Sequence, residues 1–392
     1  MRGSIVLWSI GIAWLVYVFA GYPLLLAVVA RLRRIRPQAS DDFLPSVSVL
    51  ISARNEEKDI AWKVRETLAW DYPPDRLDIW IASDASDDHT DEILGNLKDP
   101  RLHFVRMEQR GGKSRALNRM AQLAQGSLFF FSDANSHIDR ACLRRVVRHF
   151  TDPKVGCVTG NSNTPIGKDL QSSGTAVYWG HELLIRHLEN QFGSVLVCDG
   201  AIFCVRGALY QPCIPELAND LDLPLRIAHA GYWILHEPHA QVKEKDTNSP
   251  WEELSRRRRI CAQGALGMWK LRHTLRGVRA WQFISHKCMR WLLVVPMSLL
   301  LLSSFLLSGQ TIFAIFFAAQ VAFWGIALLG LGLANLGKEL PRVIRALVYF
   351  FVSILGAFLG VIDACSGSRF AIWESPALSR GDESAALQRA KG

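Results

Sequence analysis

The sequence SLFFFSDAN, from Ser127 to Asn135, decides the fold expected for this chain. Leu128 to Ser132 are apolar or small, and they predict a fully buried β-strand. The run stops at Asp133 and Asn135, whose oxygen-bearing side chains are one residue apart and so point to the same side of the strand end. Ligands of open α/β sheets bind at the carboxyl ends of strands, and Mg²⁺ takes oxygen ligands from protein, phosphates and water. The pattern predicts a metal-diphosphate site, with an ordinary Asp/Asn turn as the alternative.

This stretch belongs to a regular alternation of predicted strands and helices. The predicted strands are 47–53, 77–83, 102–107 and 128–132, and the predicted helices are 56–70, 90–97, 114–125 and 140–150. Strands that alternate with helices at this spacing are typical of an α/β fold with a doubly wound, mostly parallel sheet. We therefore expect the carboxyl ends of the first strands to meet at one edge.

Polar residues follow each of these strands. Asn55 and Glu56 come after the first strand, Asp84 ends the second, and the sequence Gly111-Gly112-Lys113-Ser114 opens the third helix. A helix N-terminus with one lysine can receive phosphate oxygens, but the spacing is not that of a P-loop, so an ATPase is not favoured. Each of these polar segments at a strand end is, taken alone, equally consistent with a helix cap or a turn. Four together favour a shared nucleotide-diphosphate ligand with a metal.

The hydrophobic segments predict a membrane protein. Ile5 to Ala30 is long and uncharged enough to span a bilayer, and three further spans are predicted at 291–307, 312–333 and 343–362. The net charge of +9 is concentrated beside these segments, at 31–36 and 256–279. The positive-inside rule then places the central domain in the cytoplasm and the N-terminus outside. The tail from Cys365 is outside if all three later segments cross, and the sequence leaves the side of this tail open. Basic residues that flank spans do not form a nucleic-acid patch, so no nucleic-acid partner is expected.

The chain is accordingly divided into four parts. Residues 1–36 are the first membrane helix with its basic flank, 45–280 the central α/β domain, 281–364 an interfacial helix with the later membrane helices, and 365–392 a tail. The eight cysteines show neither a CxxC pair nor metal-ligand spacing, and we expect reduced thiols of a cytosolic domain. His236, Glu237 and His239 resemble a metal cluster at first sight, but they follow an apolar strand and are expected to be structural.

Several ordered motifs resemble the membrane-bound family 2 glycosyltransferases, which include hyaluronan, chitin-oligosaccharide, cellulose and poly-N-acetylglucosamine synthases. The motifs are VSVLISARNEEKDI (47–60), IWIASDASDDHTDEIL (79–94), GGKSRALN (111–118), FFFSDAN (129–135), AND (218–220), GYWILHEPHA (231–240) and RRRRI (256–260). The resemblance covers about Val47 to Trp291. It implies a GT-A fold, a nucleoside-diphosphate sugar donor, Mg²⁺ or Mn²⁺ as cofactor, and inversion at the anomeric carbon.

The resemblance also assigns expected roles to individual residues on the donor side. Asp84 resembles the aspartate at the uracil or ribose end of the donor, in a pocket lined by Ala53, Asn55 and Glu56. Lys113 resembles a basic residue near the donor. Asp133 and Asn135 resemble the metal-binding DxD pair, with an amide in place of the second carboxylate.

The expected catalytic base is Asp220. An acceptor hydroxyl must lose its proton to become a good nucleophile, which requires a positioned carboxylate. Asp220 matches the base of the family in register, and Asp222 is the rival for the role. Asp222 falls where relatives carry an apolar residue, so it is expected to face elsewhere.

The acceptor side is expected to include Tyr178, Trp179 and Glu182 on a predicted helix and Gly200 in a loop, although core or interface roles fit these residues equally. RRRRI stands in the place of the QxxRW motif of processive synthases. Arg259 matches the arginine that contacts the donor diphosphate, but Arg256 replaces Gln and Ile260 replaces the Trp on which the acceptor sugar stacks. Processive extension is therefore in doubt, and a basic helix on the membrane surface is the alternative.

The sequence thus predicts a glycosyltransferase of the bacterial inner membrane that moves a sugar, with UDP-sugar as the expected donor, to a glycan or lipid-linked acceptor in envelope-glycan or exopolysaccharide synthesis. The expected partners are the donor, the acceptor and the lipid bilayer. Other envelope-glycan export proteins are further candidate partners. The alternatives are transfer of a single sugar to a lipid carrier, and a non-catalytic membrane scaffold.

Overall fold

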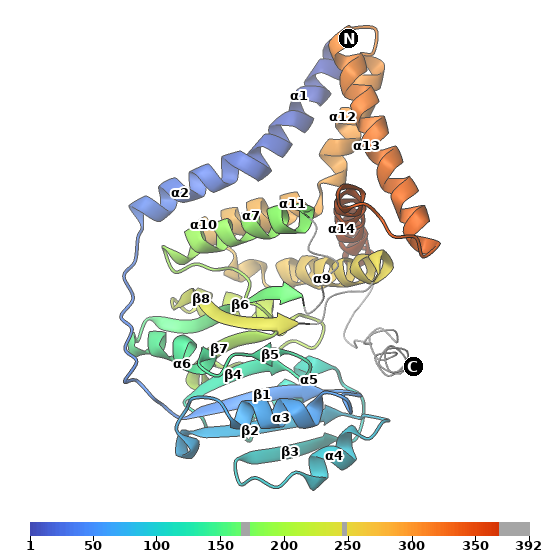
Figure 1. The fold of residues 1–392 in the computed structure, drawn as a ribbon. Coiled ribbons are helices and arrows are strands. Elements are labelled where there is room, and N and C mark those ends of the chain that lie inside the picture. Colours follow the sequence, from blue (N-terminus) through green and yellow to red (C-terminus); the bar gives the residue numbers. More distant parts are fainter. Residues whose placement is uncertain (166–172, 245–248, 368–392) are drawn as a thin grey trace.

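The computed structural model describes residues 1–165, 173–244 and 249–367. A single mixed sheet forms the centre of the domain, with the strand order β3-β2-β1-β4-β7-β6-β8-β5 (Figure 1). The strands are β1 (Val47–Ala53), β2 (Leu77–Asp84), β3 (Leu102–Met107), β4 (Leu128–Asp133), β5 (His137–Ile138), β6 (Val155–Pro165), β7 (Ile202–Arg206) and β8 (Trp233–Glu244).

The predicted alternation of strands and helices is present in the first half of the sheet. The pairs β1–β2, β1–β4 and β2–β3 are parallel, so β1, β2 and β4 end at one edge. The second half departs from the parallel pattern, because β7 is antiparallel to both β4 and β6. The pair β6–β8 is parallel and β5–β8 is antiparallel.

Helices cover both faces of this sheet because its central strands are apolar on both sides. In β1, Val49 and Ile51 belong to the apolar cluster that contains Ile60 of α3, whereas Leu50 belongs to the cluster that contains Leu117 of α5. The helices of the domain are α3 (Ile60–Leu68), α4 (Thr90–Asn96), α5 (Lys113–Ala121), α6 (Cys142–Val147), α7 (Ser173–Asn190), α8 (Asn219–His229) and α9 (Pro250–Lys270). Short 3₁₀ turns lie at Pro74–Arg76, Arg148–Thr151, Gly207–Leu209 and Arg272–Thr274.

The hydrophobic ends of the chain form a separate layer of helices (Figure 1). This layer comprises α1 (Arg2–Val16), the π-helical turn η1 (Tyr17–Gly21), α2 (Tyr22–Leu32), α10 (Val278–Gln282), the π-helical turn η6 (Phe283–Cys288), α11 (Met289–Trp291), α12 (Val294–Leu306), α13 (Thr311–Asn335) and α14 (Arg342–Cys365). Within the part of the chain that the structure describes, three helices are long and apolar enough to cross a membrane, namely Arg2–Leu32, Thr311–Asn335 and Arg342–Cys365. The bent pair Val278–Trp291 and Val294–Leu306 would be a fourth if it acts as one span.

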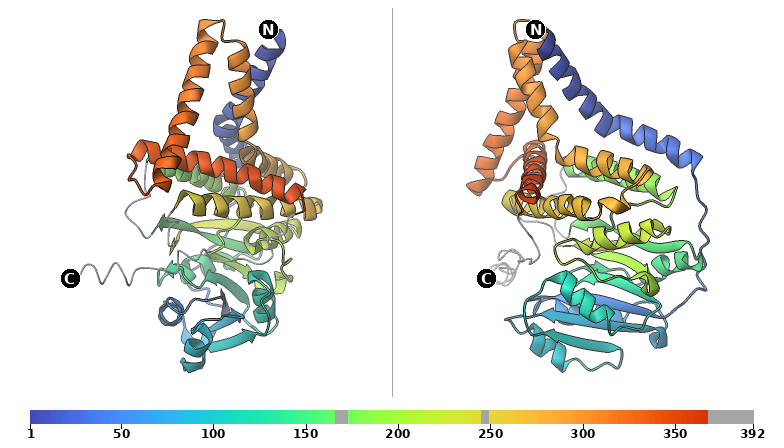
Figure 2. Two further views of the ribbon diagram at one scale, coloured as in Figure 1. Left: turned by 90° about the vertical axis from the view of Figure 1, so that its right-hand side faces the viewer. Right: turned by 180° about the vertical axis from the view of Figure 1, so that it is seen from behind.

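The last of these helices does not run alongside the others. Figure 2 shows α14 lying across the inner ends of α12 and α13, next to α9. Close packing of α14 on α9 is possible because Gly356 and Gly360 face the α9 backbone, and a Cβ at Gly356 would lie 2.7 Å from the carbonyl oxygen of Leu254. Arg258 of α9 binds Asp363 of α14 through two contacts of 2.5 and 2.7 Å. The segment expected to cross the bilayer at 343–362 is therefore docked on the catalytic domain.

Candidate active site

The ends of β1 and β2 are tied together by short polar contacts. Arg54 donates from Nη1 to the carbonyl oxygens of Asp84 and Ala85, both at 2.9 Å. The backbone N–H of Asn55 donates to Ser86 Oγ at 3.1 Å, and that of Glu56 donates to Thr90 Oγ1 at 2.8 Å. The predicted donor-side residues Ala53, Asn55 and Glu56 therefore lie together at the end of β1, next to the end of β2.

Asp84 organises the loop that precedes α5. Its two carboxylate oxygens accept the backbone N–H groups of Gly111 and Gly112 at 2.7 and 2.8 Å. Gly112 has φ +80°, a conformation that glycine adopts without strain. The sequence predicted both motifs but not this contact between them, which sets the position of Lys113 at the start of α5.

Lys113 connects the end of β4 to the loop before β7. Its Nζ donates to Asp133 Oδ1 at 2.5 Å and to the carbonyl oxygen of Gly200 at 3.2 Å. The Gly200 loop is shaped by Asp199, whose carboxylate accepts the backbone N–H groups of Ser162 at 2.8 Å and Ala201 at 3.2 Å. Asp199 was not predicted as a site residue, although its position beside Gly200 was the available signal.

Asp220 lies in the first turn of α8 against this loop. A Cβ placed on Gly200 would be 3.1 Å from Asp220 Oδ2, so the glycine allows the carboxylate to approach the loop closely. The rival Asp222 points elsewhere, since its fully buried carboxylate accepts from Arg226 Nη2 at 2.6 Å and from the backbone N–H of Ile214 at 2.9 Å. The two aspartates of this turn thus have different surroundings, as predicted.

Arg259 brings the membrane-side helix α9 into the same group. Ser249 caps α9 by accepting the backbone N–H of Glu252 at 3.2 Å, with Pro250 in the first turn. Burial lowers the pKa of Arg259 to about 10, and repulsion by Arg256 adds to this effect, while the carboxylates of Asp133 and Asp220 oppose it. Arg256 itself lies 3.9 Å from Glu253, and Ile260 is 43% exposed.

The electrostatics distinguish Asp220 from an ordinary surface carboxylate. Burial raises the pKa of Asp220 to about 6; Lys113 opposes the shift, and the negative charges of Asp199 and Asp133 add to it. A carboxyl group with this pKa is ionised at neutral pH and is basic enough to accept a proton efficiently. Asp133 thus contacts Lys113, Asp84 binds the two glycines that precede Lys113, and Asp220 interacts electrostatically with Lys113 and Asp133.

The end of β4 has a donor set that fits a hard divalent cation. Asp133 offers a carboxylate and Asn135 an amide oxygen in the turn that follows the strand. Across the described ranges, no group of three or more His, Cys, Asp or Glu side chains is arranged to hold a metal. A cation at this turn would take one or two ligands from the protein and the rest from phosphate oxygens and water, which is the usual arrangement for Mg²⁺.

The acceptor-side residues fall into two groups. Tyr178 and Trp179 lie on α7, but their side chains are outside the described residues. Glu182, also on α7, is 5% exposed and contacts three side chains of the segment before α12: His286 Nε2 at 3.1 Å, Lys287 Nζ at 3.2 Å and Arg290 Nη1 at 2.6 Å. These contacts fasten α7 to the membrane layer.

Glu237 and the cysteines lie in other surroundings. Glu237 accepts from Arg148 at 2.9 Å and lies 2.8 Å from His149 Nε2, so it serves a buried ionic contact. All eight cysteines are free thiols, including Cys157 and Cys198, whose sulfur atoms lie 3.5 Å apart.

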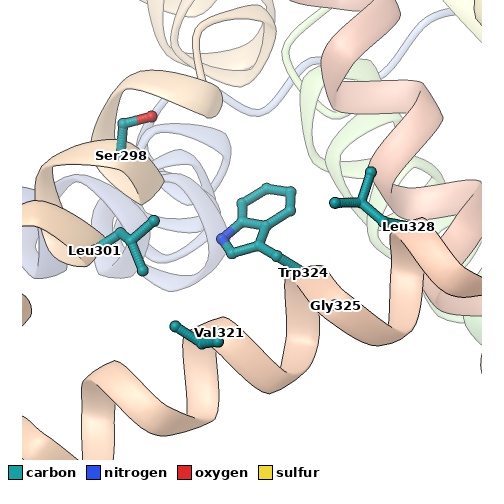
Figure 3. Close-up of a pocket in the computed structure, with 6 residues that line it drawn as sticks. All are labelled: Ser298, Leu301, Val321, Trp324, Gly325 and Leu328. Carbon is teal, nitrogen blue, oxygen red and sulfur yellow. The ribbon is translucent and has the colours of Figure 1, made fainter.

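An apolar groove lies between α12 and α13 (Figure 3). Its volume is about 380 Å³, and it is lined by Ser298, Leu301, Val321, Trp324, Gly325 and Leu328. Trp324 also packs edge-on against Phe351 of α14 at a ring-centroid distance of 5.6 Å. The groove therefore lies next to the helix that rests on α9.

Comparisons with known proteins identify the family of the chain. The sequence model of "Glycosyl transferase family 2" matches residues 48–207, and that of "Glycosyl transferase family group 2" matches residues 128–331. The beta-monoglucosyldiacylglycerol synthase of Synechocystis is 35% identical over 159 residues, covering 37% of this chain and 33% of that protein. The poly-beta-1,6-N-acetyl-D-glucosamine synthase of Staphylococcus aureus strain COL is 30% identical over 216 residues, covering 52% and 51%. The chain thus spans between a third and about half of the length of these relatives.

Among solved structures, the mannosyltransferase PcManGT from Pyrobaculum calidifontis, in complex with GDP-Man and Mn²⁺, has a TM-score of 0.67 and 20% sequence identity. The match covers 92% of this chain and 99% of that one. At this identity the likeness establishes the GT-A fold. With more than half of its length matched by a family model, the chain belongs to the family 2 glycosyltransferases and is a glycosyltransferase with a GT-A domain.

Proposed function

We propose that this protein is an inverting glycosyltransferase that moves a sugar from a nucleoside-diphosphate sugar, of the UDP-sugar class, to a glycan or lipid-linked acceptor at the bacterial inner membrane. The observation that carries the proposal is the convergence of Lys113, Asp133, Asp220 and Arg259 at the carboxyl edge of the sheet. This arrangement supports the proposal, because a carboxylate suited to act as a base lies near cationic side chains suited to stabilise a departing diphosphate.

In the proposed reaction, Asp220 accepts the proton of an acceptor hydroxyl. The oxygen forms a bond to the anomeric carbon from the face opposite the nucleotide, and the bond from that carbon to the diphosphate oxygen breaks. Arg259 and Lys113 stabilise the negative charge of the leaving diphosphate. A Mg²⁺ or Mn²⁺ ion held by Asp133 and Asn135 would supply further charge neutralisation.

The donor side of the proposal rests on Asp84, Ala53, Asn55 and Glu56. Asp84 keeps lone pairs beyond those used by Gly111 and Gly112, since a carboxylate has about four acceptor positions. PcManGT was solved with GDP-Man and Mn²⁺, which supports the nucleotide-sugar class and a divalent metal without naming the donor of this chain.

The catalytic assignment is tested by Asp220→Asn, with Asp222→Asn as the matched variant two residues away. We expect Asp220→Asn to lower turnover by about a hundred- to ten-thousand-fold while donor binding is retained. Asp222→Asn breaks a buried ion pair with Arg226, so it should lower the melting temperature and leave turnover per folded molecule nearly unchanged. The assay is release of nucleoside diphosphate from a panel of nucleotide-sugars, with and without Mn²⁺. Normal turnover by Asp220→Asn would contradict the assignment of Asp220 as the base. If the wild-type protein released no nucleoside diphosphate from any donor, the result would favour a non-catalytic scaffold.

A lipid or lipid-linked acceptor is favoured over a growing free polymer by two observations. Ile260 replaces the tryptophan on which an acceptor sugar would stack, and the groove between α12 and α13 is apolar and lies beside α14. The relatives named beta-monoglucosyldiacylglycerol synthase also carry a lipid in their name. Ser298 is four residues after the first residue of α12, which places the polar end of the groove about 6 Å from the start of that helix.

The acceptor is tested by filling the groove. Gly325 and Gly332 of α13 both have open space where a Cβ would be added, but only Gly325 lines the groove. Gly325→Leu should reduce transfer to lipid acceptors and leave donor hydrolysis by water unchanged, whereas Gly332→Leu should affect neither. Equal transfer by both variants, or a long polymer on a gel from the wild-type protein with labelled donor, would favour polymer extension instead.

A further inference from the structure

The turn that carries Asp133 and Asn135 rests on a buried lysine. Lys63 of α3 is fully buried, and its Nζ donates to the carbonyl oxygen of Ser136 at 2.6 Å and to Ser136 Oγ at 3.1 Å. Ser136 directly follows Asn135 and is itself fully buried. A lysine is almost never fully buried without a partner, because removing its charge from water is costly.

The contacts continue from Lys63 into the turn. Ser136 Oγ accepts from the ammonium group and donates its single proton to the carbonyl oxygen of Asp133 at 2.8 Å. Ser132 Oγ lies 3.1 Å from the same hydroxyl. The hydroxyl of Ser136 therefore connects the two ends of the turn, Asp133 and Ser136, and Lys63 fixes the orientation of that hydroxyl.

Two other residues of α3 hold the segment just beyond Ser136. Glu66 lies one helical turn after Lys63 and 3.6 Å from its Nζ, and it accepts the backbone N–H of Ile138 at 3.0 Å. The ring of Trp62 lies over His137 with centroids 3.8 Å apart. Three side chains of one helix thus contact three consecutive residues, 136–138, immediately after the turn.

From these contacts we infer that Lys63 is a positioning residue that holds the Asp133–Asn135 turn in the geometry required to bind a divalent cation with a nucleoside diphosphate. An apolar side chain of similar length would fill the same space without the cost of a buried charge. Burial lowers the pKa of Lys63 to about 8, and Glu66 and Asp133 oppose that effect, so the ammonium form predominates at neutral pH. The inference rests on the proposed donor site and concerns its affinity, not the chemical step.

The test measures binding in place of turnover. Binding of Mn²⁺ in the presence of UDP is followed in the full-length protein by titration calorimetry or by the EPR signal of free Mn²⁺. We expect Lys63→Met to raise the dissociation constant by about tenfold or more, as is typical when a residue that orients a metal ligand is lost. Arg65→Met is the matched control, because Arg65 is an exposed cation on the same helix. The affinity of this variant for Mn²⁺ in the presence of UDP should equal that of the wild type.

A second variant keeps the inference testable if Lys63→Met does not fold. Ser136→Ala removes the hydroxyl and leaves the carbonyl contact of Lys63, so its affinity should fall by a smaller factor. The two effects should be less than additive in the double variant, because both act through the same hydroxyl. Unchanged Mn²⁺–UDP affinity in either folded variant, with only a lower melting temperature, would show that Lys63 is merely structural. Absence of Mn²⁺–UDP binding in the wild type would overturn the donor site itself and this inference with it.

Discussion

Asp220 has the properties required of a catalytic base at neutral pH, and these determine the pH dependence of the reaction. Because burial raises the pKa of Asp220 to about 6, the carboxylate is protonated and inactive below that pH and ionised above it. Turnover at saturating donor should therefore rise about tenfold per pH unit up to about 6 and level off above it. The measurement is a pH–rate profile. Asp222→Asn is the control, and its turnover should show the same rise with pH as that of the wild type. A profile without an inflection between pH 5 and 7 would contradict the assignment.

Gly200 is a second residue at which the site can be perturbed in a controlled way. A methyl group there would lie 3.1 Å from Asp220 Oδ2, so the carboxylate must shift by a few tenths of an ångström. Since small displacements of a reacting group are costly, Gly200→Ala should lower the catalytic constant by about tenfold with little change in donor affinity. Gly95→Ala on α4 is the control, because nothing lies within 4 Å of the added carbon. Identical kinetics of the two variants would exclude close packing of the loop against the base.

The residues that the sequence predicted are those whose chemistry is visible at a strand end. Asp133, Asn135 and Asp84 follow apolar strands, so periodicity and polarity were sufficient to single them out, whereas Asp220 was assigned through its resemblance in register to the base of the family. The contacts of Asp84 with Gly111 and Gly112 and of Lys63 with Ser136 join positions far apart in the chain. Such pairings depend on how the helices and loops pack in three dimensions, and a buried lysine in a helix looks in sequence like any surface lysine.

At the scale of elements, the packing of α9 on α14 connects the membrane layer to the catalytic groups. Arg259 is the neighbour of Arg258, which binds Asp363 through both of its carboxylate oxygens. Asp363→Arg should place two cations together, shift α9 and weaken donor binding. Since the Arg258 side chain is 46% exposed, the pair contributes about 1 kcal/mol or less.

The check is a charge exchange. In Arg258→Asp combined with Asp363→Arg, the attraction is re-formed with reversed polarity, and donor KM should return toward the wild-type value. Failure of the double variant to improve on either single variant would show that the ion pair does not position α9.

The helices and strands of the first half of the domain were predictable, but the course of α14 was not. Length and hydropathy identify Arg342–Cys365 as a candidate span, but these properties do not say how the helix is oriented relative to the other helices. The contacts that hold α14 on α9 include the close approach at Gly356 and Gly360, the ion pair of Arg258 with Asp363, and a hydrogen bond of 2.9 Å from Arg257 Nη2 to the hydroxyl of Tyr349. The antiparallel insertion of β7 between β4 and β6 escaped prediction for a similar reason, because strand order is set by long-range pairing.

For the molecule as a whole, the position of α14 bears on which side of the membrane carries Cys365, a point that the sequence leaves open. If α14 lies along the inner surface beside α9, Cys365 at its end is on the same side as the catalytic domain. Cys365 is exposed, while the other seven cysteines are buried or half-buried, so the native protein can be labelled directly. A membrane-impermeant maleimide should modify Cys365 in inverted inner-membrane vesicles and not in intact spheroplasts. The opposite pattern would restore a crossing α14.

The docking of α14 also bears on how the enzyme can be handled in the laboratory. Gly356 and Gly360 leave the α9 backbone in direct contact with a segment that lies about a hundred residues further along the sequence. A fragment that ends before that segment would expose the face of α9 that packs on α14, and it would remove the partners of Arg257 and Arg258 on α14. Soluble truncation is thus a poor route to an active preparation, and detergent or nanodisc reconstitution of the intact polypeptide is the form in which its kinetics should be measured.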